Sequence, residues 1–401
     1  MDKAEALLLQ ALGCAVRGEE CTMTEKPEQE TLRRLFRLAR QQSVLPLVIQ
    51  ALASSLSEDP LFSVFQRKAR SLTIHQAQRT GDFLLLMLQL QAMGLRPAVL
   101  KGAVCRSLYP EPEQRGSLDE DLLIPPEEFP RYQEALLACG LQRKDPDRPL
   151  KGEYEVTYLD PERDIYLELH LHPFSAEEDA CGDCSRPFED ALSRIVPFRL
   201  YGQTFYTLAP TDHLLYLICH AYKHILFGGV GIRQICDICL FARQYEASLD
   251  WAGLRASCED LGILTLASAF FRVGQRHLDI PCPSAFSEPE VDELPLLADC
   301  LSGGTFGVDD PDRLHSSRIT LDAVAAGKQG RARRGIWSSI FPGKEHLQNS
   351  YPYARAHPWL LPVAWAQRLI RYAAREKGDP GKSLRIGRER VELLRKYKII
   401  P

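Results

Sequence analysis

The sequence predicts an α+β fold, in which a small mixed β-sheet is flanked by helices and helical regions occupy both ends of the chain. Three observations support this class. Apolar residues recur at helical spacing through the first eighty residues, strand-like runs follow one another in the middle third, and helical spacing returns after residue 211. The short connections between the strands favour mixed or antiparallel pairing, with helices on one side.

Four regions are predicted along the 401 residues. Residues 1–94 form an N-terminal helical region, 95–208 an α/β core, 209–300 a helical domain, and 301–401 a linker with a basic helical region. A composition of 45% hydrophobic and 25% charged residues is typical of folded domains. At about 150 residues per domain, the length favours two or three such domains.

Within the first two regions, a helix is expected from about Thr80 to Met93. The run PAVLKG predicts a strand that turns into a helix, and SLDEDLLI, EYEVTYL and RDIYLELHLH predict three more strands. The segment EEFPRYQEALLACG predicts a helix that ends at Gly140. A hairpin is expected around Tyr201-Gly202.

The C-terminal half is predicted to be mostly helical. Thr211 or Asp212 is expected to cap its first helix, and a second helix is expected over 233–245. Residues 283–312 are rich in proline, glycine and acids, which indicates a connecting segment. Residues 320–401 are basic and helical, with a stretch rich in proline and aromatic residues at FPGKEHLQNSYPYARAHPWLLP.

The chain is expected in the cytoplasm. It has no run near the roughly 18 uninterrupted apolar residues that a membrane span needs, and MDKAEALLLQALG indicates a helix rather than a signal peptide. The 12 cysteines are therefore expected to stay reduced. Cys181 and Cys184 have the spacing of a zinc knuckle, but a structural zinc site needs about four ligands and no second pair is obvious. Metal binding there stays open.

Charge is unevenly distributed. The chain carries −4 in total, but residues 321–401 contain 17 lysines and arginines against 6 acids, a net +11, which leaves −15 on the rest. A basic tail can hold nucleic acid or an anionic membrane, although the spacing of Arg368, Arg371 and Arg375 also fits the solvated face of an amphipathic helix. The net charge of −15 on the rest of the chain, which includes the candidate site described below, disfavours a polyanion as the acceptor of a transferred group. It favours a small molecule or a protein hydroxyl.

Asp119 and Asp121 are the main candidates for chemistry. They are two residues apart on a predicted strand, so both carboxylates point to the same face. Two carboxylates on one face can bind a hard divalent cation such as Mg²⁺. Glu168 lies on the polar face of RDIYLELHLH, so it becomes the third carboxylate if the two strands are neighbours.

A phosphate site is predicted at Lys101, Gly102 and Ala103. A glycine between a strand and a helix lets backbone N–H groups approach a phosphate, and Lys101 and Arg115 would add positive charge. With three carboxylates, these are the parts of a metal-assisted transfer at phosphate. Each part also has a simpler interpretation: a solvated strand edge for the aspartates, an alternating strand for Glu168, and an ordinary corner for the lysine and glycine.

Three histidines are expected to line the cleft. His170 follows Glu168 on the same strand face, and His220 and His224 are one helical turn apart, the spacing of two metal ligands. No glutamate follows the first of that pair, so the metalloprotease motif is absent. For His220 and His224 the alternatives are hydrogen bonds within the helical region or a direct contact with substrate or phosphate, and for His170 the alternative is that it orients the acceptor.

The segments LKGAVCRSLYP, RGSLDEDLLI and YLELHLHP carry a further indication. In this order they resemble the uncharacterised bacterial nucleotidyltransferase family, within the superfamily of DNA polymerase β. The resemblance continues through HLLYLICHAYKH, IRQICDICLFARQYEASLDW, FPGKEHLQNSYP and HPWLLPVAW. It implies a mixed sheet of about four or five strands with flanking helices and a helical C-terminal region. It also implies that Asp119 and Asp121 bind Mg²⁺ and that Glu168 completes the triad.

The resemblance further implies a nucleotidyl transfer. An NTP would bind with its phosphates at the predicted phosphate site, and Mg²⁺, expected as two ions, would lie on Asp119 and Asp121. A hydroxyl of a small molecule or a protein would attack the α-phosphorus, Glu168 would ligate the metal or accept the proton, and pyrophosphate would leave.

Two departures from the superfamily pattern leave an alternative open. Lysine and glycine stand where the superfamily has Gly-Ser, and Glu120 replaces the apolar residue between the aspartates. Glu120 is expected on the core face with Leu118, Leu122 and Ile124, where it either escapes to solvent or strains the site. The alternative is a non-catalytic NTP-binding or regulatory protein that retains the fold. A transferase acting on RNA ends is supported by the basic tail alone. The nucleotide, the acceptor and the oligomeric state stay open.

Overall fold

The structure is a computed structural model that describes residues 1–23, 25–146, 153–175, 181–305, 311–328, 353, 357–375 and 380–400. Its α-helices are α1 Lys3–Arg17, α2 Gln29–Gln41, α3 Leu45–Ala51, α4 Ala53–Leu56, α5 Pro60–Ala92, α6 Lys101–Arg106, α7 Phe129–Ala138, α8 Pro210–Phe227, α9 Ile232–Gln244, α10 Trp251–Asp260, α11 Leu264–His277, α12 Leu294–Gly303, α13 Pro311–Lys328, α17 Leu361–Arg375 and α18 Pro380–Lys396. Short 3-10 helices are η1 Pro112–Gln114, η2 Pro126–Glu128, η3 Gly182–Phe188, η4 Ala191–Arg194, η5 Glu246–Ser248, η6 Ser284–Phe286 and η7 Pro358–Leu360.

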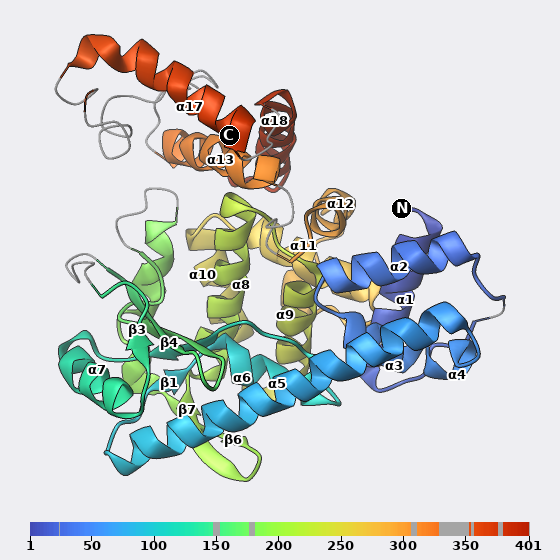
Figure 1. The fold of residues 1–401 in the computed structure, drawn as a ribbon, viewed down its shortest axis with the longest axis horizontal. Helices are drawn as coiled ribbons and strands as arrows, with labels where there is room; N and C mark the ends of the chain where they lie inside the picture. The colour runs from blue at the N-terminus through green and yellow to red at the C-terminus, as the bar shows by residue number, and fades with distance from the viewer. Residues whose placement is uncertain are drawn as a thin grey trace.

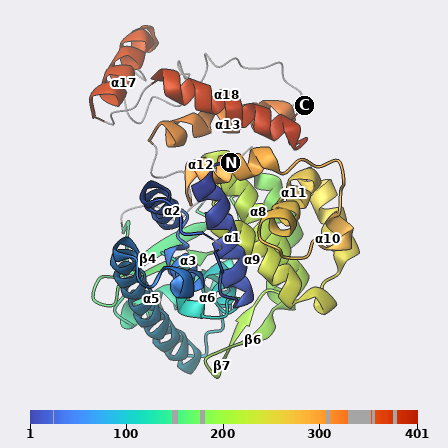
Figure 2. The ribbon, with the colours of Figure 1, turned by 90° about the vertical axis from the view of Figure 1, so that its right-hand side faces the viewer.

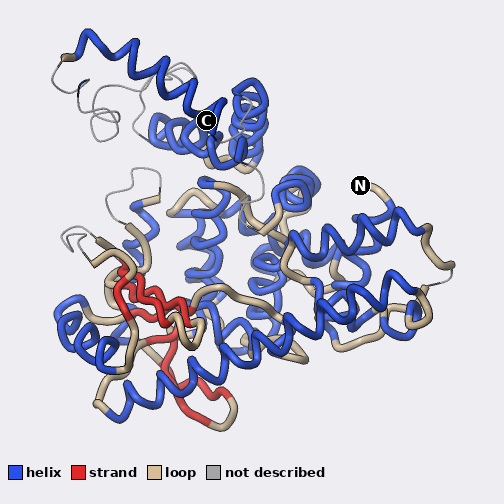
Figure 3. The backbone as a smooth tube through the Cα atoms, viewed as in Figure 1, coloured by secondary structure: helices blue, strands red, loops and turns tan. Residues whose placement is uncertain are grey.

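The described strands form one mixed sheet, drawn in red in Figure 3. They are β1 Ala98–Val99, β2 Glu120–Leu123, β3 Gln142–Arg143, β4 Glu155–Asp160, β5 Ile165–His170, β6 Val196–Leu200 and β7 Gln203–Thr207, in the order β3-β4-β5-β2-β1-β7-β6. The pairs β2–β5 and β1–β7 are parallel and the others are antiparallel. The predicted α+β class is therefore confirmed. The sheet has seven strands rather than four or five, because β3 and the β6–β7 hairpin extend its two edges.

The predicted hairpin is present. Leu200 pairs with Gln203, and the two residues between them have positive φ angles, 47° at Tyr201 and 78° at Gly202. Two consecutive positive φ angles are typical of the two-residue turns whose twist matches that of the flanking strands. The turn sequence thus determines the register of this edge of the sheet.

The helix α5 is longer than predicted. A separate helix was expected from about Thr80, but one helix of 33 residues runs from Pro60 to Ala92. The side chain of Asp59 caps it by accepting from the N–H groups of the first turn, and Gly81 does not interrupt it. In Figure 1 α5 runs along the base of the molecule from the N-terminal helices to the sheet, where Gln91 donates to the carbonyl of Thr204 at 2.8 Å.

Two predictions for the C-terminal half were wrong in detail. The helix α8 begins at Pro210, so neither Thr211 nor Asp212 is its cap; proline suits this position because it lacks the N–H that the first turn leaves unpaired. The segment 283–312 is not only a connection, because it contains α12. The expected helix over 233–245 is confirmed as α9, which is buried along almost its whole length.

A group of C-terminal helices packs on the outer ends of α8 and α12. Figure 2 shows α13 and α18 side by side above the rest of the molecule. Arg313 on α13 donates to the carbonyl of Gly228 at 2.6 Å, and Arg390 on α18 donates to the carbonyl of Ile225. Both arginines thus bind carbonyl groups at the end of α8, which helical hydrogen bonding leaves free. The stretch rich in proline and aromatic residues at 341–362 lies largely outside the described residues.

Candidate functional site

The pairing of β2 with β5 brings the predicted acids together. The two strands are parallel neighbours, and Asp121 lies directly opposite Glu168 in the register. Asp119 lies one residue before β2. The prediction for Glu168 was conditional on the two strands being adjacent, and the sheet order meets that condition.

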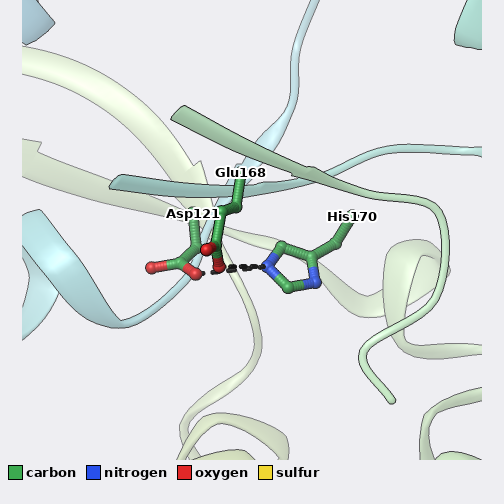
Figure 4. Close-up of side chains that lie close together, drawn as sticks. All are labelled: Asp121, Glu168 and His170. Atoms are coloured by element: carbon green, nitrogen blue, oxygen red, sulfur yellow. Dashed lines mark hydrogen bonds and ion pairs between the residues drawn. The ribbon is translucent and has the colours of Figure 1, made fainter. Parts of the chain in front are cut away.

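Three side chains converge on one point of this sheet. Figure 4 shows Asp121, Glu168 and His170 pointing toward one another. His170 Nε2 lies 3.1 Å from Asp121 Oδ1 and 3.7 Å from Glu168 Oε2. Within the described part of the chain, this is the one group of at least three histidine, cysteine or acidic residues whose ligand atoms all lie within 4.8 Å of one another. His170, expected to line the cleft, is therefore part of the acidic cluster.

Asp119 is held differently from Asp121. The Lys101 ammonium nitrogen lies 3.1 Å from Asp119 Oδ2 and 3.2 Å from Asp121 Oδ1, so it bridges the two carboxylates. Lys101 was predicted to contact phosphate. Because its ammonium group lies between the two aspartates, a phosphate that contacts it must also lie close to these acids. Asp119 keeps a quarter of its side chain exposed, whereas Asp121 is fully buried.

His220 and His224 extend this network from α8. The Lys101 ammonium lies 3.0 Å from His220 Nε2, which in turn lies 3.3 Å from His224 Nε2. Because an ammonium can only donate, His220 Nε2 must accept from it. Burial, reinforced by the charge of Lys101, lowers the pKa of both histidines well below its usual value. The two rings therefore stay neutral and hold Lys101 next to the acids.

Gly102 leaves the space that the Glu120 carboxylate occupies. A Cβ atom on Gly102 would lie 2.2 Å from Glu120 Oε2, so the glycine makes room for this carboxylate rather than for a ligand on that side. Glu120 Oε1 forms an ion pair of 2.6 Å with Arg106 Nη1, and both side chains are buried. The expectation that Glu120 escapes to solvent was therefore wrong, because this ion pair keeps its side chain buried. Leu118 was also misplaced, since it is 73% exposed and lies before β2.

The other predicted phosphate contacts, Ala103 and Arg115, are buried. Arg115 binds Asp237 of α9 through Nη2 at 2.6 Å and Nε at 3.2 Å, so its charge is already paired. It still borders a pocket beside Asp119. That pocket is lined by Lys101, Gly102, Arg115, Asp119, Leu217, His220, Arg233, Gln234, Asp237 and Ile238.

Residues outside the predicted site hold the segment that leads into β2. Gln76 accepts from the N–H of Ser117 at 2.8 Å, and Arg79 donates to the carbonyl of the same residue at 2.7 Å. Arg233 donates to the carbonyl of Gly116. Sequence reasoning missed Gln76 and Arg79. A signal was present, because Gln76 and Arg79 are polar residues three apart on one face of a helix that must pack against the core.

The buried charges of the cluster shift one another's pKa values. Burial raises the pKa of Asp121, although Lys101 acts in the opposite direction. Burial alone would lower the pKa of His170, but its contacts with Asp121 and Glu168 raise it to about 9. For Glu168, the contacts with His170 and Lys101 outweigh burial and lower the pKa. Glu168 is thus ionised near neutral pH, which is the form that binds a cation or accepts a proton.

Two further features of the described chain bear on the sequence predictions. Cys181 and Cys184 are buried and share a tight turn, in which the N–H of Cys184 donates to the carbonyl of Cys181 at 3.0 Å. Neither belongs to the group of metal-ligand atoms described above. In addition, no helix of the described residues combines the length and the apolar character needed to cross a membrane.

Comparison with known families shows the family of this chain. Residues 28–279 match the family of uncharacterised nucleotidyltransferases, and this match covers more than half of the chain. The chain belongs to this family. The membership supports nucleotidyl transfer as its general activity, while bacterial origin and the link to the DNA polymerase β superfamily stay predictions. No match was found among curated proteins or among solved structures.

Proposed function

We propose that the protein transfers a nucleoside monophosphate from an NTP to a hydroxyl group of a small molecule or a protein, with Mg²⁺ as cofactor and pyrophosphate as the second product. The observation that carries this proposal is the parallel pairing of β2 with β5, which puts Asp121 opposite Glu168. Membership in a nucleotidyltransferase family supports the type of reaction.

The residues at this point fit a divalent cation. Asp121 is fully buried and its Oδ2 atom has no hydrogen-bond partner, an arrangement that is costly for a carboxylate unless a cation offsets it. Asp119, Asp121 and Glu168 would hold Mg²⁺, which prefers oxygen ligands. When bound, Mg²⁺ lowers the pKa of a hydroxyl group and offsets the negative charge of phosphates.

The chain itself supplies the proton acceptor and the positive charge. Glu168 keeps part of its side chain exposed and is ionised, so it can take the proton of the acceptor hydroxyl. The hydroxyl oxygen then forms a bond to the α-phosphorus, the bond from that phosphorus to the bridging oxygen breaks, and pyrophosphate leaves. Lys101 and Arg233 border the pocket beside Asp119, where their charge would attract the triphosphate.

One contact favours a second candidate, a non-catalytic protein that retains the fold. The Lys101 ammonium already lies within 3.2 Å of an oxygen of each aspartate. A lysine in this position can neutralise the acids in place of a metal ion. A regulatory protein that binds NTP without transferring it would tolerate this arrangement. The two candidates differ in whether the α-phosphorus moves to an acceptor.

Label transfer separates the two candidates. The full chain is incubated with Mg²⁺ and each NTP labelled at the α-phosphorus, alone and with cell extract as a source of acceptor. We expect label on an acceptor, and a loss of about 100-fold or more for Asp121→Asn, because that substitution removes a charge in contact with the reacting groups. Asp119→Asn should also lose activity.

Glu127→Gln is the matched control, because Glu127 is an exposed acid close in sequence that lies outside the acidic cluster. It should transfer label as the wild type does. Equal transfer by Asp121→Asn and the wild type would contradict the proposal. NTP binding with no transfer under any condition would favour the regulatory candidate.

A further inference from the structure

We propose that His170 is a direct ligand of the divalent cation at Asp121 and Glu168, and that this nitrogen ligand makes the site prefer a transition-metal ion such as Mn²⁺ over Mg²⁺. The inference rests on the proposed function for the existence of a cation site. It goes further because it adds a nitrogen ligand to the carboxylate triad and states that a transition-metal ion binds there more tightly than the Mg²⁺ of the proposed reaction.

The first support is the position of the imidazole. His170 Nε2 lies 3.1 Å from Asp121 Oδ1 and 3.7 Å from Glu168 Oε2, and both carboxylates face it (Figure 4). Around an ion with bonds of about 2.1 Å, neighbouring ligand atoms lie about 3 to 3.5 Å apart. One ion can therefore bond all three atoms after small side-chain shifts. Both strands that carry them are internal to the sheet, which limits backbone movement.

The second support comes from the far side of the ring. Glu155 lies opposite His170 in the antiparallel pairing of β4 with β5, and its Oε2 lies 3.8 Å from His170 Nδ1. This is the distance of an ion pair rather than of a hydrogen bond, and a small movement of Glu155 toward the ring would form the hydrogen bond. A carboxylate on one ring nitrogen holds the proton there and leaves the other nitrogen free to bind a metal.

The third support is the burial of the cluster. Asp121 is fully buried, His170 is 3% exposed, and Asp121 Oδ2 has no hydrogen-bond partner. A cation bonded to Asp121 Oδ1 would offset the charge of this buried carboxylate. The competing interpretation is a charged imidazolium that joins two carboxylates with no metal. The two interpretations differ in whether nitrogen is bonded to an ion.

The choice of ion follows from ligand chemistry. Mg²⁺ favours oxygen ligands and retains several waters, whereas imidazole nitrogen binds first-row transition ions more strongly. Two carboxylates and one histidine in a buried site therefore favour the transition ion. Mn²⁺ is a suitable probe because it is paramagnetic and also accepts carboxylate ligands.

The test measures Mn²⁺ on the full chain in the absence of nucleotide. Pulsed electron paramagnetic resonance should detect ¹⁴N coupling from a directly bonded imidazole. Competition titration should show Mn²⁺ bound at least about tenfold more tightly than Mg²⁺. In His170→Gln the ¹⁴N coupling should disappear and Mn²⁺ affinity should fall about 10- to 100-fold, with a smaller change for Mg²⁺.

His172→Gln is the matched control, because His172 is exposed and two residues further along the chain. It should keep both the coupling and the preference. Absence of ¹⁴N coupling in the wild type, or equal Mn²⁺ binding by wild type and His170→Gln, would overturn the inference. The wild-type spectrum decides the matter even if His170→Gln does not fold.

The outcome is independent of label transfer. Transfer without ¹⁴N coupling would overturn this inference and leave the proposed function standing. Coupling without transfer would support the metal site and count against the catalytic proposal.

Discussion

Two arginines near the aspartate pair are buried as partners of acids. Arg106 binds Glu120 at 2.6 Å, and Arg115 binds Asp237 at 2.6 Å. A buried charge is costly to leave without its partner, more so than the intact pair is stabilising. The pairs therefore constrain where β2 and α9 lie relative to the segment before the site.

Removing Glu120 should destabilise the protein strongly. Glu120→Ala leaves Arg106, which is 1% exposed, without its carboxylate, and we expect the free energy of unfolding to fall by about 3–5 kcal/mol. Leu118→Ala, at a neighbouring position that is 73% exposed, should change it by less than about 0.5 kcal/mol. Urea denaturation monitored by circular dichroism measures both. A loss under about 1 kcal/mol for Glu120→Ala would contradict the role of the pair.

His213 is a buried neutral histidine away from the acidic cluster. Thr207 Oγ1 donates its single proton to the carbonyl of Val99 at 2.6 Å, so His213 Nδ1, 2.9 Å away, must donate to Thr207. His213 Nε2 has no hydrogen-bond partner. Burial lowers the pKa of His213 to about 3, which couples its protonation to unfolding.

This pKa predicts the direction of a pH effect. The unfolded chain binds a proton at His213 below about pH 6.5 while the folded chain does not until about pH 3, so stability contributed above pH 6.5 is lost as the pH falls. Between pH 7 and 5 the loss should be about 2 kcal/mol for this group. Urea denaturation at both pH values should show this extra loss in the wild type relative to His213→Gln. Parallel pH profiles for the two proteins would refute it.

At the scale of elements, glycines have opposite effects in a helix and in a turn. Gly81 lies inside the helix α5, and a Cβ atom added to it would have nothing within 4 Å. Gly202 has a φ of 78° in the hairpin turn. At Gly81 an added side chain stabilises the protein, because it reduces the freedom of the unfolded chain. At Gly202 it strains the backbone, because the φ angle is positive.

The same substitution should therefore change stability in two directions. Gly81→Ala should raise the free energy of unfolding by about 0.5–1 kcal/mol, and Gly202→Ala should lower it by about 1 kcal/mol. Thermal and urea unfolding of the two variants measure the signs. Each variant is the control for the other, and changes of the same sign would contradict the assigned backbone conformations.

At the scale of the whole molecule, the site is assembled from distant segments. The strands supply Asp121 and Glu168, α8 supplies His220, and α9 supplies Arg233. The long helix α5 reaches the same place through Arg79. No one of the four predicted regions contains the whole site, so the packing of the helices on the sheet determines its geometry.

The docking of the C-terminal helices offers a prediction at this scale. Arg390 on α18 is 2% exposed, donates to the carbonyl of Ile225 and lies 3.1 Å from Ser316 of α13. Arg390→Ala should loosen α13 and α18, seen as faster hydrogen exchange in both helices with unchanged exchange in β2 and β5. Arg385→Ala, at a position 70% exposed on the same helix, should leave exchange unchanged. Equal protection of α18 in both variants would contradict this docking.

The sequence alone was enough for features that depend on neighbours along the chain. Helical and strand periodicity predicted the α+β class, and alternation along a strand placed Glu168 and His170 on one face, because such patterns reflect repeats of about 3.6 and 2 residues. The hairpin followed from its turn residues. The length of α5 could not be predicted in the same way. The cost of one glycine inside a helix is small, and the packing of the 33-residue helix outweighs it.

Contacts between residues far apart in sequence were decided only by the tertiary structure. The neighbour of β2 in the sheet, the bridge from Lys101 to both aspartates, and the pairing of Glu120 with Arg106 all depend on which surfaces are buried together. A sequence pattern states which residues must be buried or paired, but not with which partner. The partner is selected when the whole chain removes its apolar surface from water and each charge that goes inside finds an opposite one.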